Sequence, residues 1–284
     1  MSFQEYRPAG FNVLPPVIKN LLIINGIFFV ATIIFEQKLN IDLTDILGLH
    51  YFFSEDFHPH QIITYLFMHG GFAHIFFNMF ALWMFGNVLE NTWGSKRFLV
   101  YYVVCGLGAA ALHYTVHYFE IQPTLNALND YLLNPSTEKL QGLFTSGYVK
   151  ITSPEMAQNL QPFIDEFRKN ELLGNAQNTL QASLDFIIEY KKEFLNDANV
   201  VGASGSVFGL LLAFGMMFPN SMIYMYFFFP IKAKYFVMLY GAIELFGAVS
   251  NSQTDNIAHY AHLGGMLFGF ILIKIWNKGR KQFY

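Results

Sequence analysis

The sequence has little cysteine and little charge. One cysteine, Cys105, occurs among 284 residues, so no disulfide can form within the chain and the redox compartment is left open. Only 13% of the residues are charged, against roughly one quarter in soluble domains. With 54% hydrophobic residues and a mean hydropathy of +0.33, the composition predicts a protein with several membrane spans.

Other patterns are also missing. The chain has no internal repeat, no low-complexity tract and no basic patch suited to nucleic acid, so we expect no nucleic-acid partner. It has no H-E-x-x-H pair and no cysteine partner for its histidines, which argues against a metal site. The first apolar run is followed by Glu36 and Lys38 in place of a small-residue cleavage site. We therefore expect a retained first span and no cleaved signal peptide.

Six stretches have the length and apolar character of a membrane span, which needs about 20 mostly apolar residues. They are residues 17–35, 72–89, 98–118, 200–218, 235–249 and 257–276. The apolar stretch 222–230, before the fifth span, is expected to lie at the membrane interface. The pattern predicts an all-α membrane protein with a bundle of six transmembrane helices.

The basic residues predict the orientation of the spans. With the N-terminus in the cytoplasm, the short outer loops carry only Lys38. The inner face then collects Arg7, Lys19, Lys96, Arg97, Lys232, Lys234, Lys274, Lys278, Arg280 and Lys281. An even number of spans returns the C-terminus to the same side. We therefore expect both termini in the cytoplasm and the protein in the cell (inner) membrane.

A polar segment, residues 119–199, separates the third and fourth spans and lies on the outer side in this orientation. Ser153 followed by Pro154 is typical of a helix start. Apolar residues recur at helical spacing: Leu180, Leu184, Ile187, Ile188 and Phe194. We predict two or three amphipathic helices in this segment. The chain is then expected to have three regions: 1–118 with spans one to three, 119–199 as an extracytoplasmic helical insertion, and 200–284 with spans four to six. The insertion is either a decoration or a cap over an opening on the outer face.

Polar and ionisable residues within spans are costly, and each is a functional candidate. Here they are His69, His74, Asn78, His113, His117, Ser204, Ser206, Glu244, His259 and His262. Asn78, Ser204 and His262 stand in three spans that enter from the outer side, each roughly 6–9 Å below the outer end of its span. A shared depth is what a single buried site requires.

Two G-x-x-x-G patterns follow two of these groups: Gly205 and Gly209 after the serine, Gly265 and Gly269 after the histidine. Small residues four apart let helix backbones approach closely. We therefore expect the fourth and sixth spans to pack together, with the serine hydroxyl near the imidazole.

This arrangement has a chemical use. The Ser204 hydroxyl becomes a nucleophile when a base such as His262 removes its proton. The anion formed at an attacked carbonyl needs preorganised donors, which the free N–H groups at the start of the fourth span, Asn78 and His74 can supply. Spacing places no acidic residue beside the histidine, since Asp255 lies two turns away. We predict a dyad instead of a triad.

Other roles are open for the same residues. A serine in a span is most often a packing residue, and Asn78 alone can join helices. Glu244 is expected to bond to a neighbouring helix. Ser206 competes as the nucleophile although it points about 200° around the helix, and His259 competes as the base from one turn nearer the surface. Phe208, one turn after the candidate serine, can hold the imidazole by stacking.

A metal-dependent membrane enzyme is a further alternative. His113 and His117 are four residues apart, as metal ligands on a helix often are. His69 and His74 can join them.

Three motifs resemble those of the rhomboid intramembrane serine proteases. Gly202-Ala-Ser-Gly205 is similar to G-x-S-G, the segment from His262 to Gly269 is similar to H-x-x-G-x-x-x-G on the sixth span, and His74 with Asn78 is similar to H-x-x-x-N on the second. Glu90 followed by Gly94-Ser95 resembles the turn between the second and third spans. The resemblance covers the six spans, so nearly the whole chain outside 119–199.

The resemblance implies a six-helix rhomboid-like bundle and an intramembrane serine endopeptidase. Ser204 would be the nucleophile, His262 the general base, and Asn78 and His74 would stabilise the oxyanion together with the serine backbone. The supporting residues would be Gly202, Gly205, Phe208, Gly265 and Gly269. Expected substrates are single-span membrane proteins cut at or near the surface of the lipid bilayer, with neither metal nor organic cofactor.

The chain departs from the family pattern at three places. Phe208 stands where many members have tyrosine, residues 36–57 lack a Trp-Arg pair, and the segment before the fourth span is atypical. These departures concern substrate entry more than chemistry. A non-proteolytic relative that binds membrane clients is the second alternative, although such relatives usually lack the serine or the histidine. The sequence predicts neither the oligomeric state nor the cleavage motif.

Overall fold

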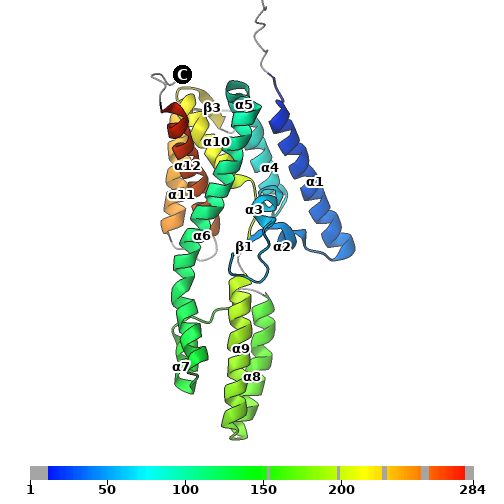
Figure 1. The fold of residues 1–284 in the computed structure, drawn as a ribbon, viewed down its shortest axis with the longest axis vertical. Coiled ribbons are helices and arrows are strands. Elements are labelled where there is room, and N and C mark those ends of the chain that lie inside the picture. The colour runs from blue at the N-terminus through cyan, green and yellow to red at the C-terminus, as the bar shows by residue number, and fades with distance from the viewer. Residues whose placement is uncertain (1–11, 152–153, 197–198, 226–228, 251–255, 279–284) are drawn as a thin grey trace, which may run out of the picture. The chain divides into compact units, whose positions relative to one another are not determined.

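The computed structural model describes residues 12–151, 154–196, 199–225, 229–250 and 256–278, and most of them are helical (Figure 1). The strands within these ranges form two short antiparallel pairs. The all-α class predicted from the sequence is confirmed.

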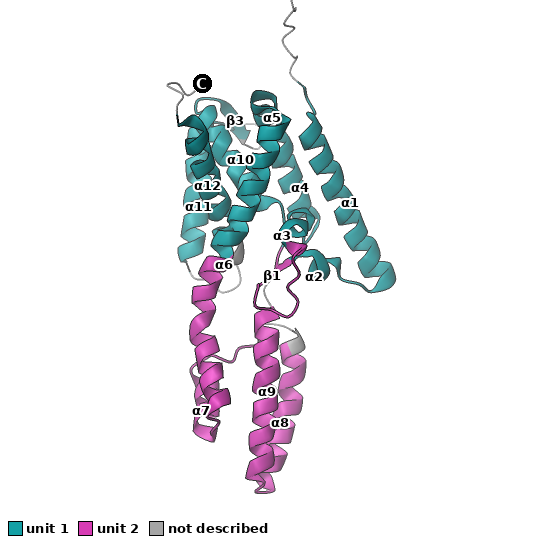
Figure 2. Cartoon of the chain, in the orientation of Figure 1, with its two compact units in different colours: residues 1–48, 62–113, 201–284 teal, residues 49–61, 114–200 magenta. Residues whose placement is uncertain are grey.

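The chain forms two compact units (Figure 2). The first unit contains Met1–Gly48, Ile62–His113 and Val201–Tyr284, and the second contains Leu49–Gln61 and Tyr114–Val200. Every residue predicted to carry chemistry belongs to the first unit, apart from His117.

Apolar helices build the first unit. They are α1 (Pro16–Leu39), α4 (Phe72–Ala81) continued by the π-helical η2 (Leu82–Gly86) and α5 (Asn87–Trp93), the first part of α6 (Ser95–Leu133), α10 (Ser204–Met217), α11 (Ala233–Val249) and α12 (Asn256–Asn277). Short helices lie between α1 and α4: α2 (Leu43–Leu47), α3 (Gln61–Thr64) and η1 (Tyr65–Phe67). Each apolar stretch predicted as a span is therefore helical over most of its length.

Three of the described helices are long and apolar enough to cross a membrane: Pro16–Leu39, the continuous Phe72–Trp93, and Ser95–Leu133. Helix α10 is also apolar but has only 14 residues. Large apolar side chains on these helices, such as Ile27 and Phe77, are exposed, as expected for surfaces that face lipid. The chain is an integral membrane protein.

Helix α10 begins later than predicted. The apolar pattern starts at Val200, but Asn199–Val200 forms strand β2, which pairs with strand β1 (Leu49–His50). Gly202 then turns the chain with a φ of +117°, and its N–H donates to the carbonyl oxygen of Tyr65 at 2.9 Å. The helix starts only after this turn, so Ser204 is its first residue and does not lie one turn inside it.

One helix extends beyond its predicted end, and one apolar stretch forms strands. Helix α6 passes its predicted end at Tyr118 and continues to Leu133, because the polar residues that end the apolar stretch are themselves compatible with a helix. The stretch 222–230 contains strand β3 (Met222–Met225) and the start of strand β4 (Phe229–Lys232), which pair antiparallel. The prediction placed this stretch at the membrane interface and named no secondary structure for it.

The second unit has its own apolar core. Helices α7 (Thr137–Thr145), α8 (Pro154–Leu172) and α9 (Ala176–Asn196) contribute to it together with the end of α6. Rings stack across α8 and α9, with the centroids of Phe163 and Phe186 4.2 Å apart. Three helices agree with the two or three amphipathic helices predicted for this segment. Ser153, the predicted cap of α8, lies outside the described residues.

The predicted apolar face of α9 is only partly correct. Ile187 is fully buried, whereas Ile188 is 54% exposed. Ile187 shares the buried face of the helix with Phe186, and Ile188, about 100° further around the helix, lies outside it.

Glu90 fixes the start of α1. Its buried carboxylate accepts the backbone N–H of Val17 at 3.0 Å, that of Ile18 at 2.9 Å and the hydroxyl of Ser95 at 2.6 Å. The first N–H groups of a helix have no partner within it and carry partial positive charge, and the carboxylate compensates both. This contact ties the first membrane helix to α5.

We expect Glu90→Ala to lower the free energy of unfolding by about 2–4 kcal/mol, because one buried and one partly buried N–H group lose a charged acceptor. Thermal unfolding of the protein purified in detergent measures this effect. Thr92→Ala is the control, since the Thr92 hydroxyl donates only to Val88 of its own helix, at 2.7 Å. Equal losses in the two variants would contradict the capping role.

Candidate active site

Ser204 stands at the N-terminus of α10. It is the first helical residue, after Ala203 in the N-cap position, and it is half-buried. The first N–H groups of any helix lack intrahelical acceptors. The serine hydroxyl therefore lies next to backbone donors and to the positive end of the helix dipole.

His74 contacts the turn that precedes the serine. A Cβ atom at Gly202 would lie 2.8 Å from Nε2 of His74, so glycine is required there both by this contact and by the positive φ. The N–H of Gly70 donates to Nδ1 of His74 at 3.4 Å. A neutral ring that accepts at Nδ1 carries its proton on Nε2, so His74 presents an N–H toward the start of α10.

Asn78 lies one turn after His74 on α4 and is buried. Its Nδ2 donates to the carbonyl oxygen of His74 at 3.1 Å. An amide nitrogen has two N–H bonds, so one remains for a second acceptor. In this structure the described hydrogen bond keeps the side chain within its own helix.

Helices α10 and α12 touch through their backbones. A Cβ atom at Gly265 would overlap the carbonyl oxygen of Gly205 and lie 2.6 Å from its carbonyl carbon. A Cβ atom at Gly209 would lie 3.1 Å from the carbonyl oxygen of Gly265. The predicted contact between the fourth and sixth helical stretches is therefore present.

The second glycine of each pair also faces α6. A Cβ atom at Gly269 would lie 3.0 Å from Cζ of Tyr101, and one at Gly209 would lie 2.7 Å from Cβ of Cys105. The Tyr101 hydroxyl donates to the carbonyl oxygen of Gly209 at 2.8 Å. The prediction assigned all four glycines to the contact between the fourth and sixth spans. In the structure Gly269 packs against α6.

The imidazole of His262 stacks on Phe208. Their ring centroids are 4.1 Å apart and the planes differ by 12°, so the stacking predicted for Phe208 is confirmed. Phe208 lies one turn after Ser204, so the imidazole lies over the face of α10 that carries the serine. Among the described residues no hydrogen bond joins the serine hydroxyl to this ring.

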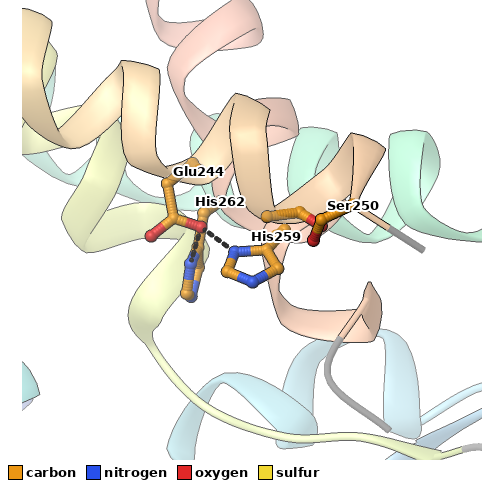
Figure 3. A network of polar contacts seen from close by, with 5 residues as sticks. Glu244, Ser250, His259 and His262 are labelled. Carbon is orange, nitrogen blue, oxygen red and sulfur yellow. Dashed lines mark hydrogen bonds and ion pairs between the residues drawn. The ribbon is translucent and has the colours of Figure 1, made fainter. Parts of the chain in front are cut away.

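A carboxylate reaches the same histidine from α11. Oε2 of Glu244 lies 2.9 Å from Nδ1 of His262 and 2.7 Å from Nδ1 of His259, and both rings turn toward it (Figure 3). Glu244 is buried. The expectation that it bonds to a neighbouring helix is confirmed, but the expectation that no acid orients His262 is wrong.

Sequence spacing could not reveal this contact, because Glu244 and His262 come from different helices. The only signal was a carboxylate inside an apolar stretch, which is costly unless it has a partner. Asp255, the acid weighed at the sequence level, lies outside the described residues. The hydrogen bond to Glu244 requires a proton on Nδ1 of His262 when the ring is neutral, so Nε2 carries the free lone pair.

The competing serine has a structural role. Ser206 is fully buried, and its hydroxyl donates to the carbonyl oxygen of Tyr102 at 2.8 Å. It joins α10 to α6 on the side away from His262.

The structure gathers metal-type ligands at a different place from the one predicted. In the described part of the chain, the group of three or more such side chains is Glu244, His259 and His262. The rings of His69 and His74 are 5.0 Å apart, while His117 belongs to the second unit and packs edge-on against Tyr51. The four-histidine set proposed as an alternative does not form.

The fold and the site together define an integral membrane protein with a serine, a histidine and a glutamate on three packed apolar helices. A family model of the Rhomboid domain matches residues 56–122 and 176–278, which is more than half of the chain. The chain belongs to the rhomboid family. The match leaves residues 123–175 between its two parts.

Two relatives share this family. The chain is 23% identical over 226 residues to the "Uncharacterized rhomboid protein P4H10.10, mitochondrial" of Schizosaccharomyces pombe, covering 76% of this chain and 51% of the relative. It is 40% identical over 47 residues to "Rhomboid protease GluP" of Bacillus subtilis, covering 16% of this chain and 9% of the relative. The chain thus spans about half the length of the first relative and a small part of the second.

Proposed function

We propose that this chain is an intramembrane serine endopeptidase in which Ser204 is the nucleophile and His262 the general base. The observation that carries the proposal is the position of the base. The His262 ring stacks on Phe208, one turn after a serine at a helix N-terminus, and Glu244 holds its Nδ1. Membership of the rhomboid family supports the same reaction class.

The reaction starts with proton transfer from the Ser204 hydroxyl to Nε2 of His262 as the oxygen attacks a peptide carbonyl carbon. Breaking the C–N bond of the tetrahedral intermediate gives an acyl-serine, and the imidazolium returns its proton to the leaving amine. Water then repeats the sequence and releases the new carboxyl end. A closing movement brings the hydroxyl and the ring into hydrogen-bond reach, as is common when a substrate binds.

The oxyanion receives donors from two helices. The N–H groups at the start of α10, which have no acceptor within the helix, supply backbone donors, and His74 adds its Nε2–H from α4. The unused N–H of Asn78 becomes a third donor once its side chain turns from the His74 carbonyl. Such donors stabilise charge that develops only in the transition state.

Glu244 replaces the predicted dyad by a Ser–His–Glu arrangement. A buried carboxylate on Nδ1 fixes the productive tautomer and stabilises the imidazolium that forms during attack. It does not take the proton itself. We assign Glu244 as a positioning residue.

The wider arrangement follows from the family and from the sequence pattern. We propose six transmembrane helices with both termini in the cytoplasm of a cell membrane, and residues 119–199 as an extracytoplasmic insertion between the regions 1–118 and 200–284. Single-span membrane proteins within the lipid bilayer are the proposed substrates. Gly205 and Gly265 support the site by close backbone packing, Gly202 leaves room for the ring of His74, and Gly269 leaves room for Tyr101 of α6.

Labelling with a fluorophosphonate, which reacts with activated serines, tests the assignment. We expect the wild type to be labelled and Ser204→Ala not to be labelled, because the phosphorus bonds to the nucleophilic oxygen. Ser206→Ala is the matched control from the same helix and should keep its label, since the Ser206 hydroxyl bonds to Tyr102. Labelling that survives in Ser204→Ala would overturn the proposal.

A further inference from the structure

Three ligand-type side chains converge beside the proposed base. One carboxylate oxygen of Glu244 and ring nitrogens of His259 and His262 all lie within 4.8 Å of one another (Figure 3). The exposed fraction of the side chain is 9% for Glu244, 19% for His259 and 15% for His262. The three side chains are therefore mostly buried, and each keeps a small exposed surface. His259 lies in the first turn of α12, so the cluster is near an end of that helix.

The second histidine has no place in the proposed reaction. A single His–Glu contact orients the base, yet Oε2 of Glu244 lies closer to Nδ1 of His259, at 2.7 Å, than to Nδ1 of His262, at 2.9 Å. His259 is held there by packing, because its ring fills the space beside Gly247 of α11. Two imidazole nitrogens and one carboxylate oxygen thus lie close together, with both nitrogens turned toward the oxygen.

We propose that Glu244, His259 and His262 bind a divalent transition-metal ion, Zn²⁺ foremost, and that the bound ion inhibits the peptidase. The inhibitory part rests on the proposed function. Two histidines and one glutamate form a ligand set that zinc accepts with a water molecule in the fourth position. Imidazole and carboxylate ligands also suit the other late first-row ions.

The three ligand atoms lie close enough together for a zinc site. Zinc binds histidine nitrogen and carboxylate oxygen at about 2.0–2.2 Å, so tetrahedral ligands stand about 3.3 Å apart. The present N–O separations of 2.7 and 2.9 Å need to widen by about half an ångström.

The bound ion inhibits by changing a tautomer. Without metal, the proton of the neutral His262 ring is on Nδ1, shared with Glu244, and Nε2 can accept the serine proton. A metal on Nδ1 takes the lone pair of that nitrogen, and the single ring proton moves to Nε2. The ring then offers an N–H where the Ser204 hydroxyl needs an acceptor. The same movement occurs in His259, so no net proton is released.

The test combines direct binding with serine labelling on the full-length protein in detergent, after treatment with a chelator. We expect calorimetric titration with Zn²⁺ to show one site per chain. The variants His259→Ala and Glu244→Gln should each bind roughly a hundred-fold more weakly, because each loses one of three ligands. In the wild type, saturating zinc should slow fluorophosphonate labelling of Ser204 roughly a hundred-fold or more, which is the contribution of a general base. Chelation should restore the rate.

Each variant is compared with its own metal-free labelling rate, so that any loss of basal activity cancels. The double substitution His58→Ala and His60→Ala is the control for surface histidines, since these rings stack 5.7 Å apart in the second unit. It should keep both zinc binding and inhibition.

The outcomes separate the two proposals. No zinc binding by a wild type that labels at Ser204 would overturn the metal site and leave the peptidase intact. Binding that is equally tight in His259→Ala and Glu244→Gln would also overturn it. Zinc binding that needs these residues, in a protein that never labels at Ser204, would support the metal site and refute the peptidase.

Discussion

The His262→Ala variant is expected to cleave a transmembrane substrate at least a hundred-fold more slowly than the wild type, and as much as about ten-thousand-fold, which is the range for loss of a general base. Without the imidazole, the hydroxyl at the start of α10 keeps its proton during attack. The turnover number should fall while KM stays near its wild-type value, because the ring is not required to hold the substrate. Cleavage of a single-span reporter protein in proteoliposomes measures both constants.

Glu244→Gln tests the contribution of the carboxylate to the same turnover number. The amide keeps the size of the side chain but loses the charge that stabilises the imidazolium, so we expect the turnover number to fall by as much as about ten-thousand-fold. Its thermal unfolding should show that the fold is retained. Wild-type turnover in Glu244→Gln would show that the contact in Figure 3 is structural only.

One result would assign the role of general base to the neighbouring His259. Loss of fluorophosphonate labelling in His259→Ala, with labelling retained in His262→Ala, would assign proton transfer to His259. The stacked position of His262 over the serine-bearing face of α10 favours the opposite result. His58→Ala, in the second unit, is the control for histidine removal and should cleave at the wild-type rate.

Gly265→Ala is expected to lower both stability and activity strongly. The added methyl group would overlap the carbonyl oxygen of Gly205 and lie 3.1 Å from its Cα atom. Backbone cannot rotate away as a side chain can, so α10 and α12 must separate, at a cost of about 1–3 kcal/mol or more. The separation moves His262 away from Ser204, and Gly265→Val should be worse than Gly265→Ala.

Gly26→Ala provides the matched control on α1. A Cβ atom at Gly26 would meet no atom within 4 Å, so the same methyl group should be neutral or slightly stabilising. Thermal unfolding in detergent and reporter cleavage are measured on both variants. Wild-type stability and activity in Gly265→Ala would contradict the backbone contact between α10 and α12.

The helical stretches were predictable from the sequence because their signal is local. A run of about 20 apolar residues excludes most alternatives to a membrane helix. The stretches that became α1 and α12 were located to within a few residues. The start of α10 was misplaced because the pairing of Val200 with Leu49 depends on a strand partner far away in the sequence.

The candidate site was predictable only in part. Depth and the glycines that follow them selected Ser204 and His262 as candidates, and the resemblance to rhomboid proteases supplied the roles proposed for them. The backbone contact of Gly205 with Gly265 bears out the packing expected from these glycines. The assignment of all four glycines to one pair was wrong, because helical spacing does not say which of two neighbours, α10 or α6, a glycine faces.

The sequence by itself determined the membrane class, the helical stretches and the residue types that can carry acyl transfer. The tertiary structure decided that Glu244 of α11 meets His262 and His259 of α12, and that Ser204 begins its helix. The physical reason is the range of the forces involved. The burial of apolar side chains can be predicted from a run of consecutive residues. A hydrogen bond between two helices depends instead on their crossing angle and on the rotation of each helix about its own axis. A charged group in an apolar stretch signals that it has a partner, and only the fold identifies that partner.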